Sequence, residues 1–189
     1  MIRIGILGDI GSGKSYVAKK FGYPVFNADK EVSDLYKKDK KTFQKLKKKL
    51  PNYFRSFPVK KKDVSQAILE SNINLKKIIK IVHFEIRKKL LIFLRKNKSK
   101  KFVILDIPLL LENKINNKND ILIFVKTKKF EVLKKLKKLE NFNKKLMNKF
   151  QNIQLSLAYK KNKSQYVIKN DFTKKTVITY IKNILKKIQ

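Results

Sequence analysis

Short apolar runs alternate along the chain with longer segments in which apolar residues recur at every third or fourth position. Five of the runs are interpreted as strands, at residues 2–7, 24–26, 102–110, 120–125 and 166–168. The runs FVILDIPLL and DILIFV are apolar almost throughout, which is typical of parallel strands buried on both faces. Strands that alternate with helical segments predict an α/β fold with a parallel five-stranded sheet and helices on both faces.

The helical segments are unevenly distributed between these strands. Helices are predicted after Lys14, from NADKEV to Tyr36, over most of residues 42–97 with a break at Pro51 and Pro58, over 129–140, up to about Tyr159 and from Lys174 onward. The stretch between the second and third strands is too long for a plain crossover, so we expect a lobe at the edge of the sheet. Ligands should bind beyond the carboxyl ends of the strands. With 189 residues, 42% of them hydrophobic, we expect one domain.

The charge balance is strongly basic and has two interpretations. The chain carries 49 Lys and Arg against 14 Asp and Glu, a net charge of +35, and only four of the basic residues are arginine. Such an excess is typical of nucleic-acid-binding proteins. The lysines are, however, spread over the whole chain together with many Asn and Ile residues, which favours a compositional bias that places lysine on solvated faces. We therefore expect no specific nucleic-acid partner.

Other compositional features narrow the class of protein. No apolar run is long enough to cross a bilayer, so no membrane partner is expected. The absence of cysteine excludes a disulfide framework and thiolate metal sites. Because the first residues read as a strand and not as a leader peptide, we expect a cytoplasmic protein.

The segment GDIGSGKS satisfies the spacing of a phosphate-binding loop, with a strand before it and a helix after it. The glycines let backbone N–H groups surround the phosphates of a nucleoside triphosphate, and Lys14 should reach the outer phosphates. Ser15 is the expected Mg²⁺ ligand, and the carboxylate of Asp9 should point outward from the phosphates. The predicted nucleotide-binding residues are Gly8, Asp9, Ile10, Gly11, Ser12, Gly13, Lys14, Ser15 and Tyr16.

Three of the few acidic residues stand at or just after the ends of apolar runs, where a base or a metal partner is needed. Asp29 is a candidate catalytic base and also a candidate N-cap of the following helix, and the two roles are compatible. Asp106 is either a Mg²⁺ partner beside Ser15 or a carboxylate that caps the strand end. Glu112 is either a substrate-binding residue or a solvated loop acid.

Four segments, taken in order, resemble the dephospho-coenzyme A kinases. They are GDIGSGKSYVAKKFGYPVFNADKEV, HFEIRKKL, DIPLLLEN and YVIKN. The resemblance implies a three-layer phosphate-loop kinase fold with a helical acceptor-binding lobe and a helical lid. It also implies that ATP, with Mg²⁺, phosphorylates the ribose 3′-hydroxyl of dephospho-coenzyme A in the last step of coenzyme A synthesis. A monomer or weak oligomer is expected.

The resemblance assigns roles by position in the family's motifs. It places the catalytic base at Asp29 and the closing asparagine at Asn170, and it implies a core of residues 1–29, 101–127 and 146–189, an acceptor-binding lobe at about 30–100 and a lid at about 128–145. Acceptor-binding residues are His83, Pro108, Leu109, Leu110 and Glu112, and the lid cations are Lys134, Lys135 and Lys138. The chain departs from the family's pattern at Tyr16, Asn27, Phe84, Lys169 and in a lid that carries lysine where arginine is usual.

Two alternative functions fit the same residues less well. The first is another nucleoside or nucleotide kinase of the same fold, since the loop alone does not select the acceptor. The second is a basic, ATP-dependent nucleic-acid-binding factor, which the net charge suggests but which lacks an aromatic-glycine RNA motif.

Overall fold

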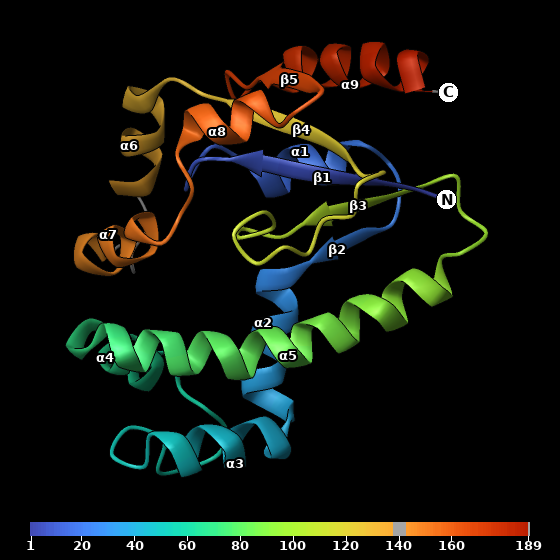
Figure 1. The fold of residues 1–189 in the computed structure, drawn as a ribbon. Helices are drawn as coiled ribbons and strands as arrows, with labels where there is room; N and C mark the ends of the chain where they lie inside the picture. The colour runs from blue at the N-terminus through green and yellow to red at the C-terminus, as the bar shows by residue number, and fades with distance from the viewer. Residues whose placement is uncertain (138–142, 189) are drawn as a thin grey trace. The chain divides into compact units, whose positions relative to one another are not determined.

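A parallel sheet forms the centre of the fold in the computed structural model, which describes residues 1–137 and 143–188. The strands are β1 (Ile2–Gly8), β2 (Val25–Asn27), β3 (Phe102–Asp106), β4 (Ile121–Lys126) and β5 (Tyr166–Lys169). They are arranged in the order β2-β3-β1-β4-β5, and every neighbouring pair is parallel (Figure 1). The predicted α/β fold with a parallel five-stranded sheet is confirmed.

Helices connect the strands and make up most of the remaining chain. They are α1 (Lys14–Lys20), α2 (Ala28–Lys38), α3 (Lys40–Lys49), α4 (Lys61–Glu70), α5 (Asn72–Lys96), α6 (Lys129–Lys137), α7 (Lys144–Asn152), α8 (Leu157–Asn162) and α9 (Lys174–Ile188). The predicted break at Pro51 and Pro58 lies between α3 and α4, as expected. The predicted hinge near residues 140–143 lies almost wholly outside the described residues.

Two predicted elements end earlier than the apolar pattern suggested. The run over 102–110 is not one strand, because β3 ends at Asp106 and a turn begins at Pro108, which has no N–H to donate to a neighbouring strand. The helix predicted up to Tyr159 is also wrong, because α7 ends at Asn152 and α8 begins after Ser156. The Ser156 hydroxyl accepts a hydrogen bond from the Tyr159 N–H and thereby starts a new helix.

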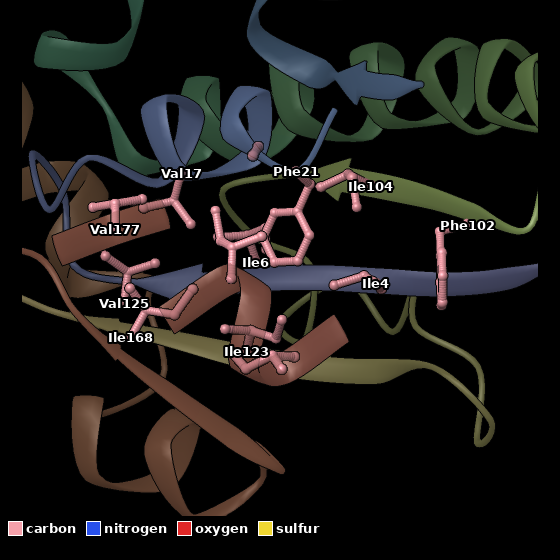
Figure 2. Close-up of a cluster of buried hydrophobic side chains, with 13 residues drawn as sticks. Ile4, Ile6, Val17, Phe21, Phe102, Ile104, Ile123, Val125, Ile168 and Val177 are labelled. Atoms are coloured by element: carbon pink, nitrogen blue, oxygen red, sulfur yellow. The ribbon is translucent and has the colours of Figure 1, made fainter. Parts of the chain in front are cut away.

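One face of the sheet carries the main hydrophobic core (Figure 2). Alternate residues of the central strands, such as Ile4 and Ile6 of β1, point to this face and are fully buried. Helices α1 and α9 cover them. The core consists of Ile4, Ile6, Val17, Ala18, Phe21, Phe102, Ile104, Ile123, Val125, Ile168, Val177, Ile181 and Ile184.

On the opposite face, β1 leaves room for a neighbouring side chain. A Cβ atom at Gly5 would lie 2.6 Å from a Leu110 methyl carbon and 2.8 Å from one of Leu122. The turn after β3 therefore packs directly on the backbone of β1, and α8 also lies against this strand. Both contacts place segments from distant parts of the sequence next to the strand that leads into the glycine-rich loop.

The described residues form two compact units. The first contains residues 1–27, 96–137 and 153–188, and the second contains 28–95 and 143–152. Within the second unit, ion pairs join α5 to two other helices, from Lys89 to Glu31 of α2 at 2.9 Å and from Glu85 to Lys45 of α3 at 2.6 Å. The domain division expected from the sequence stays a prediction, because compactness does not show what each unit binds. In the described residues, no helix is long and apolar enough to cross a membrane.

We predict that the central strands dominate the stability of the first unit. Ile123→Ala removes a fully buried side chain of β4, so the free energy of unfolding should fall by about 2–5 kcal/mol. Leu157→Ala is the control in the same unit, since Leu157 is 42% exposed on α8 and its loss should change stability by no more than about 0.5 kcal/mol. Urea denaturation of both variants measures the difference, and equal losses would contradict this view of the core.

Candidate active site

The glycine-rich loop joins the end of β1 to the start of α1. Gly11 and Gly13 have φ angles of 77° and 85°, in the left-handed region that favours glycine. At Gly13 there is also no space for a side chain, because a Cβ atom would lie 2.4 Å from the Asn170 side-chain nitrogen. The loop's shape therefore requires glycine here for two separate reasons.

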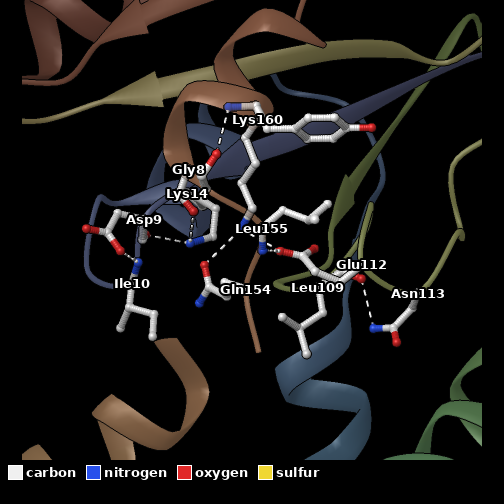
Figure 3. A network of polar contacts seen from close by, with 12 residues as sticks. Gly8, Asp9, Ile10, Lys14, Leu109, Glu112, Asn113, Gln154, Leu155 and Lys160 are labelled. Atoms are coloured by element: carbon white, nitrogen blue, oxygen red, sulfur yellow. Dashed lines mark hydrogen bonds and ion pairs between the residues drawn. The ribbon is translucent and has the colours of Figure 1, made fainter. Parts of the chain in front are cut away.

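Lys14, the first residue of α1, bends back onto the loop. Its amino group donates to the Asp9 carbonyl oxygen at 2.7 Å and to the Gly8 carbonyl oxygen at 3.3 Å (Figure 3). The Asp9 carboxylate accepts the Ile10 N–H at 2.7 Å and points away from the Lys14 amino group. The Lys14 amino group is thus held against the start of the loop by neutral carbonyl oxygens.

The Ser12 carbonyl oxygen is fixed from outside the loop. It accepts hydrogen bonds from the Thr127 hydroxyl at 3.0 Å and from the Asn170 amide at 2.8 Å. Thr127 directly follows β4 and Asn170 directly follows β5. The carboxyl ends of two strands therefore hold the middle of the loop.

Helix α6 packs against the same loop. Val132 and Leu136 are buried, and a Cβ atom at Gly11 would lie 2.8 Å from a Val132 methyl carbon and 3.1 Å from Leu136 Cγ. Of the predicted lid cations, Lys134 is exposed on α6, Lys135 lies on the same helix and Lys138 lies outside the described residues.

Asp106, at the carboxyl end of β3, is 3% exposed. Its carboxylate accepts a hydrogen bond from the Asn27 amide at 2.5 Å, which links the ends of β3 and β2. Asn27 is one of the positions at which the chain departs from the pattern of the family that it resembles, and its side-chain amide acts here as a hydrogen-bond donor.

A Mg²⁺ ion is compatible with the residues present. In the described residues, no three His, Cys, Asp or Glu side chains are grouped as a metal site. Mg²⁺ bound with nucleotides needs only one or two protein oxygens, since phosphates and water complete its shell. Ser15 and Asp106 provide a hydroxyl and a carboxylate, and oxygen atoms of this kind are the ligands that Mg²⁺ prefers.

Glu112 lies in the turn after β3 and is held by a lysine that the sequence analysis did not single out. The Lys160 amino group lies 2.8 Å from one Glu112 carboxylate oxygen and 2.8 Å from the Gln154 side-chain oxygen (Figure 3). The same Glu112 oxygen accepts the Leu155 N–H at 3.0 Å. Lys160 is 1% exposed. The interpretation of Glu112 as a solvated loop acid is wrong, because only 9% of its side chain is exposed.

The other residues of the turn differ in accessibility. Leu110 is fully buried over Gly5, so its contribution is to packing in this structure, whereas Pro108 and Leu109 are half-buried. Direct contact between these three residues and an acceptor stays a prediction.

Asp29 and His83 belong to the second unit. Asp29 is exposed and is the second residue of α2, so its interpretation as the N-cap is wrong, since the helix begins at Ala28. His83 is half-buried on α5. Its neighbour Phe84, another position at which the chain departs from the family's pattern, is 54% exposed and has the Lys88 amino group 4.2 Å from its ring centre. Helix α5 continues without interruption through this point.

The segment after β5 is fixed by its own polar groups. Asn170 accepts the Phe172 N–H at 2.9 Å, and the Asp171 carboxylate accepts hydrogen bonds from the Thr173 N–H and from the hydroxyls of Thr173 and Thr176. The hydrogen bond from the Thr173 backbone is the main cause that holds the pKa of Asp171 below its ordinary value. These contacts anchor the start of α9 beside the glycine-rich loop.

Comparison with known proteins identifies the family. Residues 2–176 match the family model described as dephospho-CoA kinase. The chain belongs to the dephospho-CoA kinase family. A dephospho-CoA kinase of Wolbachia pipientis wMel is 32% identical over 187 residues, which cover 96% of this chain and 95% of that protein.

Solved structures show the same fold. A crystal structure from Thermus thermophilus has a TM-score of 0.78 at 22% identity and covers 100% of this chain and 98% of that one. A dephospho-CoA kinase from Campylobacter jejuni has a TM-score of 0.61 at 18% identity, with 99% and 97% covered. At these identities the likeness is one of fold, and the residues above keep their roles as predictions.

Three residues of this site did not stand out in the sequence. Lys160 and Gln154 gave no signal, because lysine and polar amides occur throughout the chain. Thr127 could have been found, since it directly follows an apolar run, and polar residues at the carboxyl end of a parallel strand often line a ligand site.

We predict that removing one partner of the Glu112–Lys160 ion pair lowers the free energy of unfolding more than removing both charges does. Lys160→Met leaves the Glu112 carboxylate buried without its cation, so the free energy of unfolding should fall by about 3–5 kcal/mol. The double variant Glu112→Gln with Lys160→Met removes the charge as well and should recover most of the loss. Urea denaturation measures the cycle, and a double variant no more stable than Lys160→Met would contradict the pairing.

Proposed function

We propose that the protein transfers the γ-phosphate of ATP to the ribose 3′-hydroxyl of dephospho-coenzyme A, giving coenzyme A and ADP. The observation that carries the proposal is the loop from Gly8 to Ser15, placed between β1 and α1 in a chain whose family match spans residues 2–176. The loop is the basis for proposing ATP as the phosphate donor, and the family match is the basis for proposing dephospho-coenzyme A as the acceptor.

The donor phosphates bind at the loop. Residues 8–16 are the proposed nucleotide-binding segment, and their backbone N–H groups are the anion-binding groups. The Lys14 amino group now lies on the Gly8 and Asp9 carbonyl oxygens, which are weak partners for a cation compared with a phosphate. On ATP binding we expect it to exchange these acceptors for the outer phosphates and to balance charge on the phosphoryl group in transit.

Ser15 and Asp106 are the residues proposed to hold Mg²⁺. When bound, the ion would neutralise phosphate charge at the donor. Asn27 contributes indirectly, because its amide occupies one oxygen of Asp106 and thereby orients the carboxylate.

Asp29 is proposed to accept the proton of the attacking ribose hydroxyl. Its carboxylate is exposed and lies only two residues beyond the end of β2, whose carboxyl end faces the same edge of the sheet as the loop. The acceptor would be bound by a lobe at about 30–100, with His83, Pro108, Leu109, Leu110 and Glu112 as acceptor-binding residues.

The segment at about 128–145 is proposed to act as a lid that excludes water, which would otherwise compete for the phosphoryl group. The packing of α6 on Gly11 supports this proposal, because a movement of α6 would change the contacts of the glycine-rich loop. The lysines proposed for the lid are Lys134, Lys135 and Lys138. As point charges, they would neutralise phosphate without the paired hydrogen bonds that arginine makes.

We propose a cytoplasmic monomer or weak oligomer with no specific nucleic-acid partner. The even spread of lysine along the sequence, on helices of both units and in loops, supports the proposal that no specific nucleic acid is bound.

We predict that Lys14→Ala leaves a folded protein with phosphoryl transfer reduced by more than about 100-fold, because the lysine balances charge in the transition state. A coupled assay with dephospho-coenzyme A, adenosine and AMP as acceptors measures both the loss and the acceptor preference. Lys19→Ala, at the other end of α1, is the matched control and should retain activity. Preference for adenosine or AMP would contradict the proposed acceptor, and normal turnover of Lys14→Ala would contradict the role of the loop.

We predict that Asp29→Asn lowers the rate of phosphoryl transfer while it leaves helix α2 folded. Loss of a general base typically lowers the rate by about 10²- to 10⁴-fold, so transfer to dephospho-coenzyme A should fall by that order. The helix loses only a first-turn carboxylate, which costs no more than about 1 kcal/mol. ATP affinity should be unchanged. Glu31→Gln, in the same first turn, is the control. Equal activity of Asp29→Asn and wild type would move the base elsewhere, with Asp106 as the next candidate.

A further inference from the structure

The Ser12–Gly13 peptide of the loop is held by two donors from outside it. The Thr127 hydroxyl and the Asn170 amide both donate to the Ser12 carbonyl oxygen, at 3.0 and 2.8 Å. A carbonyl oxygen has two lone pairs, so these donors use its full capacity as an acceptor. The oxygen is therefore fixed in direction.

Fixing this oxygen also fixes the next N–H group. Among the described residues, the one cis peptide bond joins Phe57 to Pro58, so the Ser12–Gly13 bond is trans. In a planar trans peptide the C=O and N–H groups point in opposite directions. The Gly13 N–H is therefore turned away from Thr127 and Asn170.

We propose that Thr127 and Asn170 are positioning residues for the phosphates of ATP, acting through the Ser12–Gly13 peptide. This inference rests on the proposed function of the loop. By holding the Ser12 oxygen on the side of β4 and β5, the two side chains present the Gly13 N–H to the bound anion. They also keep an oxygen dipole, which would repel phosphate, out of the site.

The surroundings of Asn170 suit this role. Asn170 is 3% exposed, and its backbone N–H donates to the Lys126 carbonyl oxygen at 2.8 Å. Its side-chain oxygen accepts the Phe172 N–H, and its side-chain nitrogen is the donor to the Ser12 carbonyl oxygen. Both ends of the amide are thus determined, and its nitrogen lies where a Gly13 side chain would be. Thr127 is half-buried and adds the second donor from β4.

The test uses Thr127→Val, which removes the hydroxyl and keeps the shape of the side chain. Losing one neutral hydrogen bond should raise the Kd for ATP by about 3- to 10-fold. The KM for dephospho-coenzyme A should be unchanged, and Thr127→Ser should restore ATP affinity. Thr179→Val is the matched control, since the Thr179 hydroxyl also donates to a backbone carbonyl, that of Lys175, but on α9.

Titration calorimetry with ATP and thermal unfolding without ATP separate the outcomes. A Thr127→Val protein that melts at a lower temperature but binds ATP like wild type has lost only a structural contact, which would overturn the proposal. Equal weakening by Thr179→Val, or failure of Thr127→Ser to restore affinity, would also overturn it.

The proposed function is judged by a different measurement. Wild-type protein that binds ATP but does not phosphorylate dephospho-coenzyme A contradicts the acceptor assignment. The ratio of ATP affinities between Thr127→Val and wild type still decides the role of Thr127.

Discussion

The glycine-rich loop depends for its shape on hydrogen bonds that come from the ends of two other strands. Glycines at positive φ allow the required turn, but glycine also allows many others. The Ser12 carbonyl oxygen, held by Thr127 and Asn170, selects one of them. This selection works because β1, β4 and β5 are parallel neighbours, so their carboxyl ends lie at the same edge of the sheet.

Other polar side chains of the first unit also lie at the carboxyl ends of strands. Asp106 ends β3 and is oriented by Asn27 at the end of β2. The turn that follows β3 packs over Gly5 and presents Glu112 to Lys160. Since α8 lies against β1, the buried ion pair ties the turn to the segment that follows α7. The apolar core on one face of the sheet thus holds the strands whose carboxyl ends carry these polar groups.

Lysine illustrates how position changes the meaning of a residue. The net charge of +35 made individual lysines uninformative in the sequence. In the structure, Lys14 lies on loop carbonyl oxygens and Lys160 is buried against a carboxylate, whereas Lys134 is exposed on α6. Burial without a partner would cost several kcal/mol, on the order expected for an isolated charge, so Glu112 and Gln154 are needed for Lys160 to be accommodated.

Two elements end before their apolar pattern does, because local signals compete. Apolar residues continue past Asp106, but Pro108 cannot extend the ladder of the strand, and Leu110 packs on the sheet from a turn. Helical spacing continues past Asn152, but Ser156 caps a separate helix. Periodicity counts apolar side chains and does not include the backbone hydrogen bonds that begin and end elements.

The sequence by itself determined the parallel sheet, the phosphate-binding loop and the family, because each is encoded in contiguous residues: apolar runs, glycine spacing and short motifs. Only the tertiary structure decided that Thr127 and Asn170 share one carbonyl oxygen and that Glu112 is paired with Lys160. These partners are separated by 48 to 158 positions in the chain. Their contact depends on strand order and on the packing of α8, which no local pattern contains.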